Sequence, residues 1–579
     1  MQVMEKYNVE FYRWLDFAGL TDSEREELLA IRDNEEEKAF RFKNPISFGT
    51  AGLRSVMCLG ISMMNRFTVA QTTRALGELV CELGFSERGV VIVFDSRNNS
   101  ELFAKVSASV LANMGIKVYI FDSVRPTPEL SFALRELSAI AGINITASHN
   151  PKEYNGYKAY WEDGAQIGAE IATEISKRRE NFEILDTSDM DLYDKFVNLG
   201  KILVLGEEFD ELYLGAVLKT AINPDAIKLV SDDLRVVYTP LHGAGYKLVP
   251  KLFSMLSLKH LYTVTEQMIP DGNFPTVEKP NPEYREVFKL GIEIADRVRS
   301  NLVIATDPDS DRVGVVARRS DGEFVTITGN QMGALLLDYV IRERRASGKL
   351  PDYAFAVKSI VSTDMARVIC QKNNVKLHDV LTGFKYIGET IKNYEKEGLD
   401  DGFLLGFEES YGYLLGSYAR DKDAVGASML ILEMTAYYQK HNMTLLDALD
   451  ALYEKYGYYA ESTIDIYMEG YDGADRMKRA MERIKNTPPK NIGGVSVVSI
   501  GDYNKGEFIK LESGEATPTG QPKSNVLYYT LKNDDKIIVR PSGTEPKIKI
   551  YILAHDENKE NLDKKTEQYS LDARKMLEA

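Results

Sequence analysis

The sequence predicts an α/β protein, and three observations support this. Short runs rich in β-branched and apolar residues alternate with helical patterns along most of the chain, for example at 90–94, 235–239 and 302–306. These runs are apolar throughout, which is typical of strands in sheets that helices cover on both faces. The length of 579 residues, at ~150 residues per domain, predicts about four domains.

The predicted elements begin with a helix. The run 21–42 starts with Thr, Asp and Ser ahead of Glu residues, a helix-start signature, and predicts an N-terminal helical lead-in. Predicted strands follow at 90–94, 117–121, 143–146, 235–239, 302–306, 353–357 and 403–407. Beyond a linker near 456–459 the pattern changes to strands and hairpins with a helical tail, which predicts a smaller α+β domain with a mobile loop at 513–525.

Composition excludes several classes of protein. The net charge of −16 argues against nucleic acid or an anionic membrane as a partner, because concentrated Lys and Arg hold such partners. No apolar run approaches the ~18 residues of a membrane helix, and the N-terminus has no signal-peptide pattern. Three cysteines without metal-ligand spacing favour a reducing compartment, so we expect a cytoplasmic protein.

Three of the predicted strands run directly into polar loops. INIT leads into ASHNP, LVIAT into DPDSDR, and FLLGF into EESYG. Ligands of open α/β sheets collect beyond the carboxyl ends of strands. We therefore expect the three loops to face one cleft.

The loop DPDSDR carries three carboxylates, on Asp307, Asp309 and Asp311. In a loop or extended chain, residues at i, i+2 and i+4 point to one side, and hard oxygen ligands suit Mg²⁺ or Ca²⁺. An EF-hand is excluded, because Arg312 and Arg318 stand where its Gly and Glu belong. The alternative is a solvated turn. Open coordination positions favour Mg²⁺ completed by a phosphate.

Ser148 follows the strand INIT, and Asn150 and Pro151 open the next element. Backbone amides near such a start can bind an anion, which suits a phosphoserine. A serine hydrolase is disfavoured, because there is no G-x-S-x-G elbow and an extended backbone would point His149 away from Ser148. The alternative for Ser148 is a simple turn or cap.

Two further loops offer ligand-binding groups. RPSGTEPK lies between two predicted strands and presents Arg540, two hydroxyls and the amides around Gly543, a phosphate pocket in one interpretation and a hairpin turn in the other. GFEESYG places Glu408 and Ser410 on one side, where carboxylate and hydroxyl can bind sugar hydroxyls. Basic residues elsewhere are ordinary surface charges when taken singly: Arg54, Lys158, Lys385, Arg420 and Lys422.

Together these motifs resemble the α-D-phosphohexomutase superfamily, most closely its long phosphoglucomutase and phosphomannomutase branch. TASHNP, DPDSDR, FEES and RPSGTEPK stand in the family's order, along with FGTAGLR, PDGNFPTVEKPNPE, TGFKYIGE and ARDKDAV. The resemblance implies three related α/β domains with mixed sheets plus a C-terminal α+β domain of TATA-binding-protein-like fold, heart-shaped around a central cleft. We expect domains at 1–210, 211–328, 329–456 and 457–579.

The resemblance also implies residue roles. Ser148 resembles the phosphoserine, and Asp307, Asp309 and Asp311 bind Mg²⁺ together with its phosphoryl oxygen. Lys158 resembles the general acid/base, and burial near Arg54, Arg312 and His149 is expected to lower its pKa. Arg54 and His149 assist catalysis. The expected substrate-binding residues are Arg312, Lys385, Glu408, Ser410, Arg420, Lys422, Arg540, Ser542, Gly543 and Thr544.

The implied activity is interconversion of glucose 1-phosphate and glucose 6-phosphate through a phosphoserine enzyme and glucose 1,6-bisphosphate, with one Mg²⁺ per chain. The second Glu of FEES favours glucose, although Phe407 and Tyr411 depart from the usual glycine-flanked loop. Mannose and pentose phosphates stay open as substrates, as do a bisphosphate synthase or phosphatase. A non-enzymatic scaffold would have lost Ser148 or the aspartates. The expected partners are small sugar phosphates, and the oligomeric state stays open.

Overall fold

The protein is described from a computed structural model that covers residues 5–49, 52–468, 473–541 and 547–578. The chain forms two compact units. Unit 1 comprises residues 1–327, 388–401 and 412–442, and unit 2 comprises 328–387, 402–411 and 443–579. In the described part of the chain, no helix is both long and apolar enough to cross a membrane.

Unit 1 begins with three short helices, α1 (Lys6–Leu15), α2 (Asp22–Ala30) and α3 (Glu35–Phe42). Thr21 caps α2 in a capping box with Glu24, as the start signature predicts. The helical lead-in predicted over 21–42 consists of two helices, because Asn34 caps a new helix by accepting a hydrogen bond from the Glu37 N–H. The three helices bury a cluster that contains Phe11, Trp14 and Phe42.

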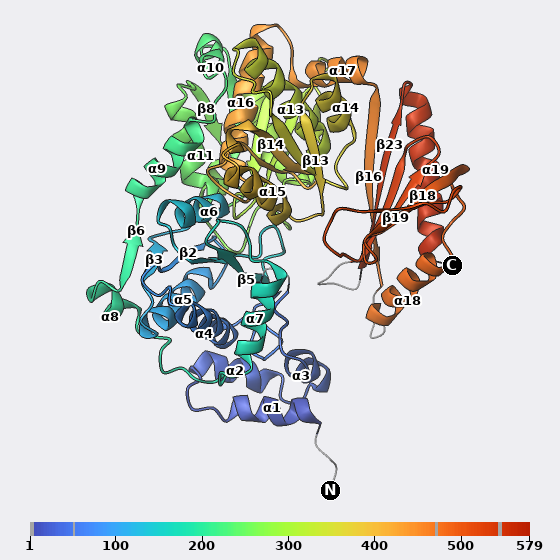
Figure 1. Cartoon of the computed structure of the whole chain (residues 1–579). Coiled ribbons are helices and arrows are strands. Elements are labelled where there is room, and N and C mark those ends of the chain that lie inside the picture. Colours follow the sequence, from blue (N-terminus) through green and yellow to red (C-terminus); the bar gives the residue numbers. More distant parts are fainter. Residues whose placement is uncertain (1–4, 50–51, 469–472, 542–546, 579) are drawn as a thin grey trace. The chain divides into compact units, whose positions relative to one another are not determined.

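A six-stranded sheet follows, in the order β1-β5-β4-β2-β3-β6. Pairs among β4, β2, β3 and β6 are parallel, whereas β5 is antiparallel to both β4 and β1. Figure 1 shows α4 and α5 on one face of this sheet and α6 on the other. The strands are β1 (Gly52–Val56), β2 (Val90–Phe94), β3 (Val118–Phe121), β4 (Ala141–Ile145), β5 (Tyr154–Trp161) and β6 (Ile202–Leu205). The helices are α4 (Arg66–Glu82), α5 (Ser100–Asn113), α6 (Thr127–Glu136), α7 (Ala169–Arg179), α8 (Tyr193–Asn198) and α9 (Glu207–Leu218).

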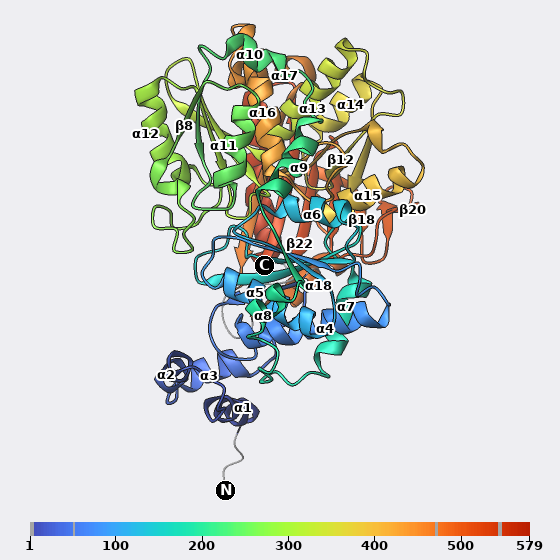
Figure 2. The same ribbon diagram turned by 90° about the vertical axis from the view of Figure 1, so that its left-hand side faces the viewer.

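The second sheet of unit 1 repeats this pattern in the order β11-β10-β9-β7-β8. β9, β7 and β8 are parallel, and β10 is antiparallel to β9 and β11. Figure 2 shows α11 and α12 on opposite sides of β8. The elements are α10 (Asp225–Val230), β7 (Arg235–Thr239), α11 (Gly245–Met255), β8 (His260–Thr263), η1 (Thr265–Met268), η2 (Arg285–Phe288), α12 (Lys289–Val298), β9 (Leu302–Thr306), β10 (Val313–Arg318) and β11 (Phe324–Ile327). β15 (Gly412–Leu414) and α16 (Ala424–Lys440) also belong to unit 1.

The two sheets of unit 1 place polar loops at equivalent positions. In each sheet, a buried parallel strand turns into an antiparallel neighbour, β4 into β5 and β9 into β10. The first turn carries Ser148 and the second carries Asp307, Asp309 and Asp311. The buried strands β4 and β9 thus supply rigid bases for the two loops.

Unit 2 contains β12 between two parallel neighbours, β13 and β14. Its elements up to residue 456 are α13 (Gly329–Ala346), β12 (Phe355–Ser359), α14 (Met365–Lys372), β13 (Lys376–Val380), β14 (Phe403–Glu408) and α17 (Leu445–Tyr456). α15 (Phe384–Lys396) and η3 (Asp400–Gly402) cross the sequence boundaries between the units.

The C-terminal part of unit 2 is a mainly antiparallel sheet in the order β16-β23-β22-β21-β18-β19-β20, with β17 paired to β18. Figure 1 shows α18 and α19 on one side of this sheet. The elements are β16 (Tyr458–Tyr467), α18 (Gly473–Asn486), β17 (Asn491–Ile492), β18 (Val495–Asp502), β19 (Glu507–Lys510), β20 (Ala516–Pro518), β21 (Leu527–Leu531), β22 (Lys536–Pro541), β23 (Lys547–Asp556) and α19 (Lys559–Glu578).

The expected strands match β2, β3, β4, β7, β9, β12 and β14 within a few residues. Gly457 alone separates α17 from β16, so the predicted linker is one residue long. The stretch 513–525 is not wholly a loop, because β20 pairs with β19 there. The four domain boundaries stay predictions.

Candidate active site

Ser148 lies in a tight turn with a left-handed backbone, at φ 53°. Its N–H donates to Thr146 Oγ1 (2.8 Å), and its Oγ donates to Asp307 Oδ2 (2.9 Å). The extended backbone that was expected to point His149 away is wrong. The left-handed turn brings His149 Nδ1 to 3.2 Å from Ser148 Oγ. The element after Asn150 and Pro151 is the strand β5, so the chain does not begin a helix there.

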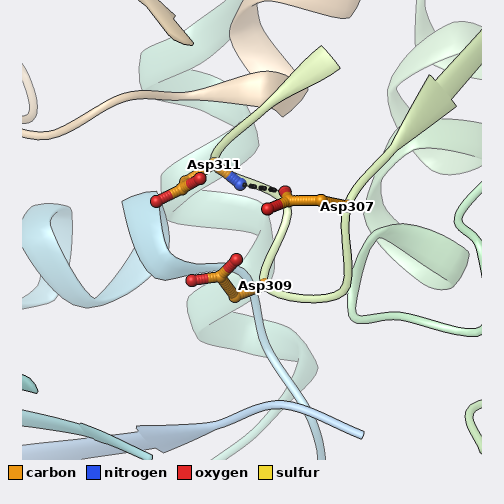
Figure 3. Close-up of side chains that lie close together, drawn as sticks. All are labelled: Asp307, Asp309 and Asp311. Carbon is orange, nitrogen blue, oxygen red and sulfur yellow. Dashed lines mark hydrogen bonds between the residues drawn. The ribbon is translucent and has the colours of Figure 1, made fainter. Parts of the chain in front are cut away.

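The three aspartates of the β9–β10 turn point toward one another, as Figure 3 shows. One oxygen from each lies within 4.8 Å of the others, and all three side chains are buried. Asp307 Oδ1 accepts hydrogen bonds from the N–H groups of Asp311 (3.1 Å) and Arg312 (3.0 Å). The i, i+2, i+4 spacing therefore gathers the carboxylates on one side of the loop, as predicted.

Cations from other elements partly neutralise this cluster. Lys158 Nζ on β5 lies 2.8 Å from Asp309 Oδ2 and 3.8 Å from Asp311 Oδ2. Lys422 Nζ lies 3.2 Å from Asp311 Oδ2. Arg312 pairs with Glu283 at 2.8 Å and approaches Asp311 at 3.8 Å.

The pKa values of these groups show the excess of negative charge. Burial, together with Asp309, raises the pKa of Asp307 well above its usual range, and the pKa of Asp311 is raised for the same two reasons. Burial would also raise the pKa of Asp309, but Lys158 outweighs it and the net shift is downward. Asp307 and Asp311 are therefore harder to ionise than ordinary aspartates.

The expected shift of Lys158 is wrong in direction. Burial by itself lowers its pKa, but Asp309 and Asp311 outweigh burial, and the net pKa is raised. The sequence argument counted the neighbouring cations and omitted the two carboxylates beside the ammonium group. For His149, burial and then Arg312 and Arg54 lower the pKa well below its usual range, which keeps the ring neutral.

The cluster fits a divalent cation. Asp309 Oδ1 and Asp311 Oδ1 are buried and have no hydrogen-bond partner among the described residues. Buried carboxylate oxygens without partners are costly unless a cation binds them, and hard oxygens suit Mg²⁺ or Ca²⁺. The adjacent Ser148 Oγ is a fourth oxygen, 2.9 Å from Asp307.

Two further predicted residues of unit 1, Arg54 and Arg420, have partners outside the carboxylate cluster. Arg54 on β1 is exposed and donates to Asn150 Oδ1 at 3.2 Å, beside the serine turn. Arg420 is buried, and its guanidinium pairs with Glu395 at 2.8 Å. This partner gives Arg420 a structural explanation, and its substrate-binding role stays a prediction.

The remaining predicted residues belong to unit 2. Glu408 ends β14, is 7% exposed, and accepts a hydrogen bond from the Gly383 N–H at 2.7 Å. Ser410 is half-buried in the following turn, and Lys385 lies in the first turn of α15. Arg540 is the penultimate residue of β22 and donates to the Tyr551 hydroxyl. Ser542, Gly543 and Thr544 lie outside the described residues.

Several residues near the site were missed by the sequence analysis. Thr127, at the start of α6, donates from its hydroxyl to Asp309 Oδ2 (2.9 Å) and from its N–H to the Asp309 carbonyl (2.8 Å). Asp421 lies 3.1 Å from Lys422 Nζ and accepts a hydrogen bond from Tyr160. Asp95 and Arg97 contact the serine turn. The last two follow a buried strand directly, and the strand-into-polar-loop pattern could have revealed them.

A fold with repeated α/β sheets, a buried carboxylate trio and an adjacent serine hydroxyl defines a class of metal-dependent phosphoryl-transfer enzyme. Comparison with family models finds phosphoglucomutase/phosphomannomutase α/β/α domains I, II and III at residues 45–183, 211–322 and 328–456. The chain belongs to the phosphoglucomutase/phosphomannomutase family.

Curated relatives and solved structures agree with this assignment. A phosphoglucomutase from Staphylococcus saprophyticus is 37% identical over 92% of this chain and 94% of its own. One from Staphylococcus aureus strain USA300 is 36% identical over 88% and 90%. The open form of pp63/parafusin from Paramecium shares the fold, with a TM-score of 0.66 and 18% identity over 92% and 95%.

Proposed function

We propose that this enzyme is a phosphoglucomutase, which interconverts glucose 1-phosphate and glucose 6-phosphate through phosphoserine 148. The observation that carries the proposal is the hydroxyl of Ser148, which donates to Asp307 within the carboxylate cluster. Relatives named phosphoglucomutase, 36–37% identical over most of the chain, support glucose as the sugar of the substrate. The enzyme belongs to the isomerases and acts as an intramolecular phosphotransferase.

The proposed reaction uses each described group at a stated atom. Phosphoserine 148 gives its phosphoryl group to a sugar monophosphate, and the resulting glucose 1,6-bisphosphate returns its other phosphate to Ser148 Oγ. Asp307, Asp309 and Asp311 hold one Mg²⁺, which would neutralise charge on the transferring group. Lys158 exchanges a proton with the sugar hydroxyl, and Arg54 and His149 flank the serine.

The raised pKa of Lys158 has a consequence for this role. Its two carboxylate neighbours hold the proton, so Lys158 is charged at neutral pH in the protein by itself. A cation on the same carboxylates competes for their negative charge and would weaken their hold on the Lys158 proton. Lys158 that has lost this proton can accept the proton of the attacking sugar hydroxyl in the first transfer and return it to the sugar oxygen in the second.

Unit 2 supplies the proposed recognition groups. Glu408 and Ser410 bind sugar hydroxyls, Lys385 contacts the substrate, and Arg540 with the loop 542–544 binds the distal phosphate. Arg312, Arg420 and Lys422 of unit 1 contribute positive charge to phosphate binding. The second Glu of the FEES loop, Glu409, accepts a hydrogen bond from Ser359 at 2.9 Å, and we assign it to holding the loop.

Three cysteines without a disulfide support a cytoplasmic location.

A substrate panel tests the proposal. Glucose, mannose, ribose and N-acetylglucosamine 1-phosphates are assayed with Mg²⁺ and a trace of the matching bisphosphate. We expect glucose 1-phosphate to lead by at least about tenfold in kcat/KM, which corresponds to ~1.4 kcal/mol. A higher kcat/KM for mannose or ribose 1-phosphate would show that this sugar phosphate is the substrate. Release of inorganic phosphate at the rate of isomerisation would indicate a phosphatase.

Ser148→Ala tests the phosphoserine itself. We expect it to lose isomerisation and to take up no phosphate from labelled glucose 1,6-bisphosphate, because the hydroxyl that accepts the phosphoryl group beside Asp307 is gone. The Ser410→Ala variant is the matched control and should still be labelled. Activity of Ser148→Ala near the wild-type level would refute the mechanism.

A further inference from the structure

Asp95 and Arg97 directly follow the buried strand β2 and have no part in the proposed function so far. Both side chains are 0% exposed, and Arg97 Nε lies 3.3 Å from Asp95 Oδ2. A buried ion pair costs desolvation energy, and it is retained only where its remaining hydrogen bonds are satisfied. The partners of this pair therefore indicate what it holds.

Arg97 binds the backbone of the serine turn. Its Nη2 donates to the carbonyls of Ser148 and Asn150, each at 2.5 Å. Its Nη1 donates to the carbonyls of Pro151 (2.9 Å) and Tyr154 (3.0 Å). One planar guanidinium thus fixes four carbonyls between Ser148 and the start of β5, a pattern that the single head of a lysine cannot reproduce.

Asp95 holds the other side of the same residue. Thr146 donates its hydroxyl to Asp95 Oδ2 at 2.6 Å, and the oxygen of this hydroxyl accepts the Ser148 N–H at 2.8 Å. The N–H and the carbonyl of Ser148 are therefore both held by one ion pair. Such a hold is needed because a left-handed backbone at a residue other than glycine is strained, at a cost of about 1–3 kcal/mol.

A loop from the second sheet covers this pair. The Phe274 ring lies 5.2 Å from the guanidinium carbon of Arg97, and Phe274 is 2% exposed. Gly272 approaches so closely that a Cβ there would lie 2.3 Å from the Asn98 backbone nitrogen. This contact explains the motif PDGNF, which the proposed function leaves without a role: its glycine allows the loop to pack on the polar turn after β2.

We propose that Arg97, paired with Asp95 and covered by Phe274, is the positioning residue that holds Ser148 in its left-handed turn with Oγ directed at Asp307. It touches no reacting atom and acts through the backbone of Ser148. The inference rests on the proposed phosphoserine chemistry and adds to it the device that aligns the serine. A displacement of a reacting group by about 1 Å can lower the rate by about 10²-fold.

Arg97→Lys is the central test, with Arg74→Lys as its matched control. Arg74 is another buried arginine of unit 1, which pairs with Asp189 (3.0 Å) and donates to the Asp186 carbonyl (2.8 Å). Both variants lose a buried guanidinium, but only one loses the hold on Ser148. We expect Arg97→Lys to lower kcat by about 10²-fold with KM within about twofold, and Arg74→Lys to keep kcat within about twofold.

A second variant, Thr146→Val, tests the same role if Arg97→Lys does not fold. Thr146→Val keeps the shape of the side chain but removes the hydroxyl that connects Asp95 to the Ser148 N–H. We expect kcat to fall by about tenfold. Hydrogen exchange of the peptide 146–154 should be faster in Arg97→Lys and in Thr146→Val than in wild type, and unchanged in Arg74→Lys.

Labelling of Ser148 separates the two proposals. If wild-type protein takes up no phosphate from labelled bisphosphate, the phosphoserine mechanism itself fails. If wild-type protein is labelled and folded Arg97→Lys is labelled at the same rate, or exchanges its 146–154 amides no faster, the positioning role is refuted. Equal losses of kcat in Arg97→Lys and Arg74→Lys would also refute it, because the effect would then be one of stability alone.

Discussion

Two groups of aspartates and cations, one in each unit, differ in charge balance. The carboxylate cluster of unit 1 joins Asp307, Asp309 and Asp311 to Lys158 and Lys422. The ion-pair cluster of unit 2 joins two aspartates, Asp364 and Asp379, to Lys358, Arg367 and Lys536. In the first, three aspartates face two lysines and Arg312, and Arg312 is itself paired with Glu283. In the second, three cations face two aspartates.

The pKa shifts follow this balance. In the ion-pair cluster, burial would raise the pKa of both aspartates, but Lys358 and the other cations outweigh it, and both are lowered. In the carboxylate cluster two of three are raised. The same residue types thus form an ion-pair cluster where cations outnumber aspartates, and a cluster suited to binding a cation where negative charge is in excess.

The largest expected effect is on activity, from Asp309→Asn. This variant removes a carboxylate that would bind the proposed cation and that also pairs with Lys158. We therefore expect kcat/KM to fall by about 10³-fold. Asp379→Asn in the ion-pair cluster is the control and should keep kcat/KM within about threefold in folded protein. Steady-state kinetics at saturating Mg²⁺ measure both, and similar losses would contradict the contrast between the clusters.

The next effect is on stability, from Lys358→Met. Lys358 is 1% exposed and lies 3.0 Å from Asp379 Oδ1 and 3.4 Å from Asp364 Oδ1. Its removal leaves the partly exposed carboxylates of Asp364 and Asp379 with fewer cations, and we expect a loss of about 1–3 kcal/mol, less than for a fully buried pair. Denaturant unfolding, monitored for unit 2 by its own transition, measures the loss. Loss of Mg²⁺ binding in this variant would contradict the separation of the two clusters.

Asp307→Asn should have the opposite effect on metal-free protein. The folded pKa of Asp307 lies above its unfolded value, so the folded protein binds a proton that the unfolded chain has released, and stability falls as pH rises through that pKa. Asparagine removes this loss, and we expect a gain of about 1 kcal/mol at pH 8 in EDTA. Mg²⁺ should raise the Tm of wild type and not of the variant. A wild-type Tm independent of EDTA would contradict the proposed metal site.

The smallest effect concerns Glu461 on β16, near the ion-pair cluster. Burial raises its pKa to about 7, although Thr363 and Lys358 oppose the shift. The folded protein therefore keeps a proton up to about pH 7 that the unfolded chain loses near pH 4.5, and this contribution to stability is lost as pH rises between these values. Glu461→Gln should remove this pH dependence, which amounts to about 1 kcal/mol or less in the free energy of unfolding. That part of the Tm–pH curve should therefore become flatter. A curve parallel to that of wild type would contradict the assignment.

The sequence predicted the strands and the carboxylate cluster well, because both depend on local patterns. Apolar runs need burial on both faces, and aspartates two residues apart in a loop share a side. It failed for His149, because one left-handed residue reverses the direction of its neighbour, and for Lys158, because Asp309 and Asp311 are more than a hundred residues away along the chain. Arg97 was missed because the strand-into-polar-loop pattern was not applied to the strand at 90–94, and its four carbonyl partners leave no trace in the identity of residues.

The matching turns of the two sheets of unit 1 show how this chemistry is distributed. The β4–β5 turn presents a single hydroxyl, and the β9–β10 turn presents three carboxylates, from the same position in two copies of one strand arrangement. Under the proposed function, a repeated module contributes the group that carries phosphate in one copy and the ligands for its counter-ion in the other. Each turn can change in sequence without disturbing the strands that support it, so a duplicated scaffold could acquire the two halves of a reaction separately.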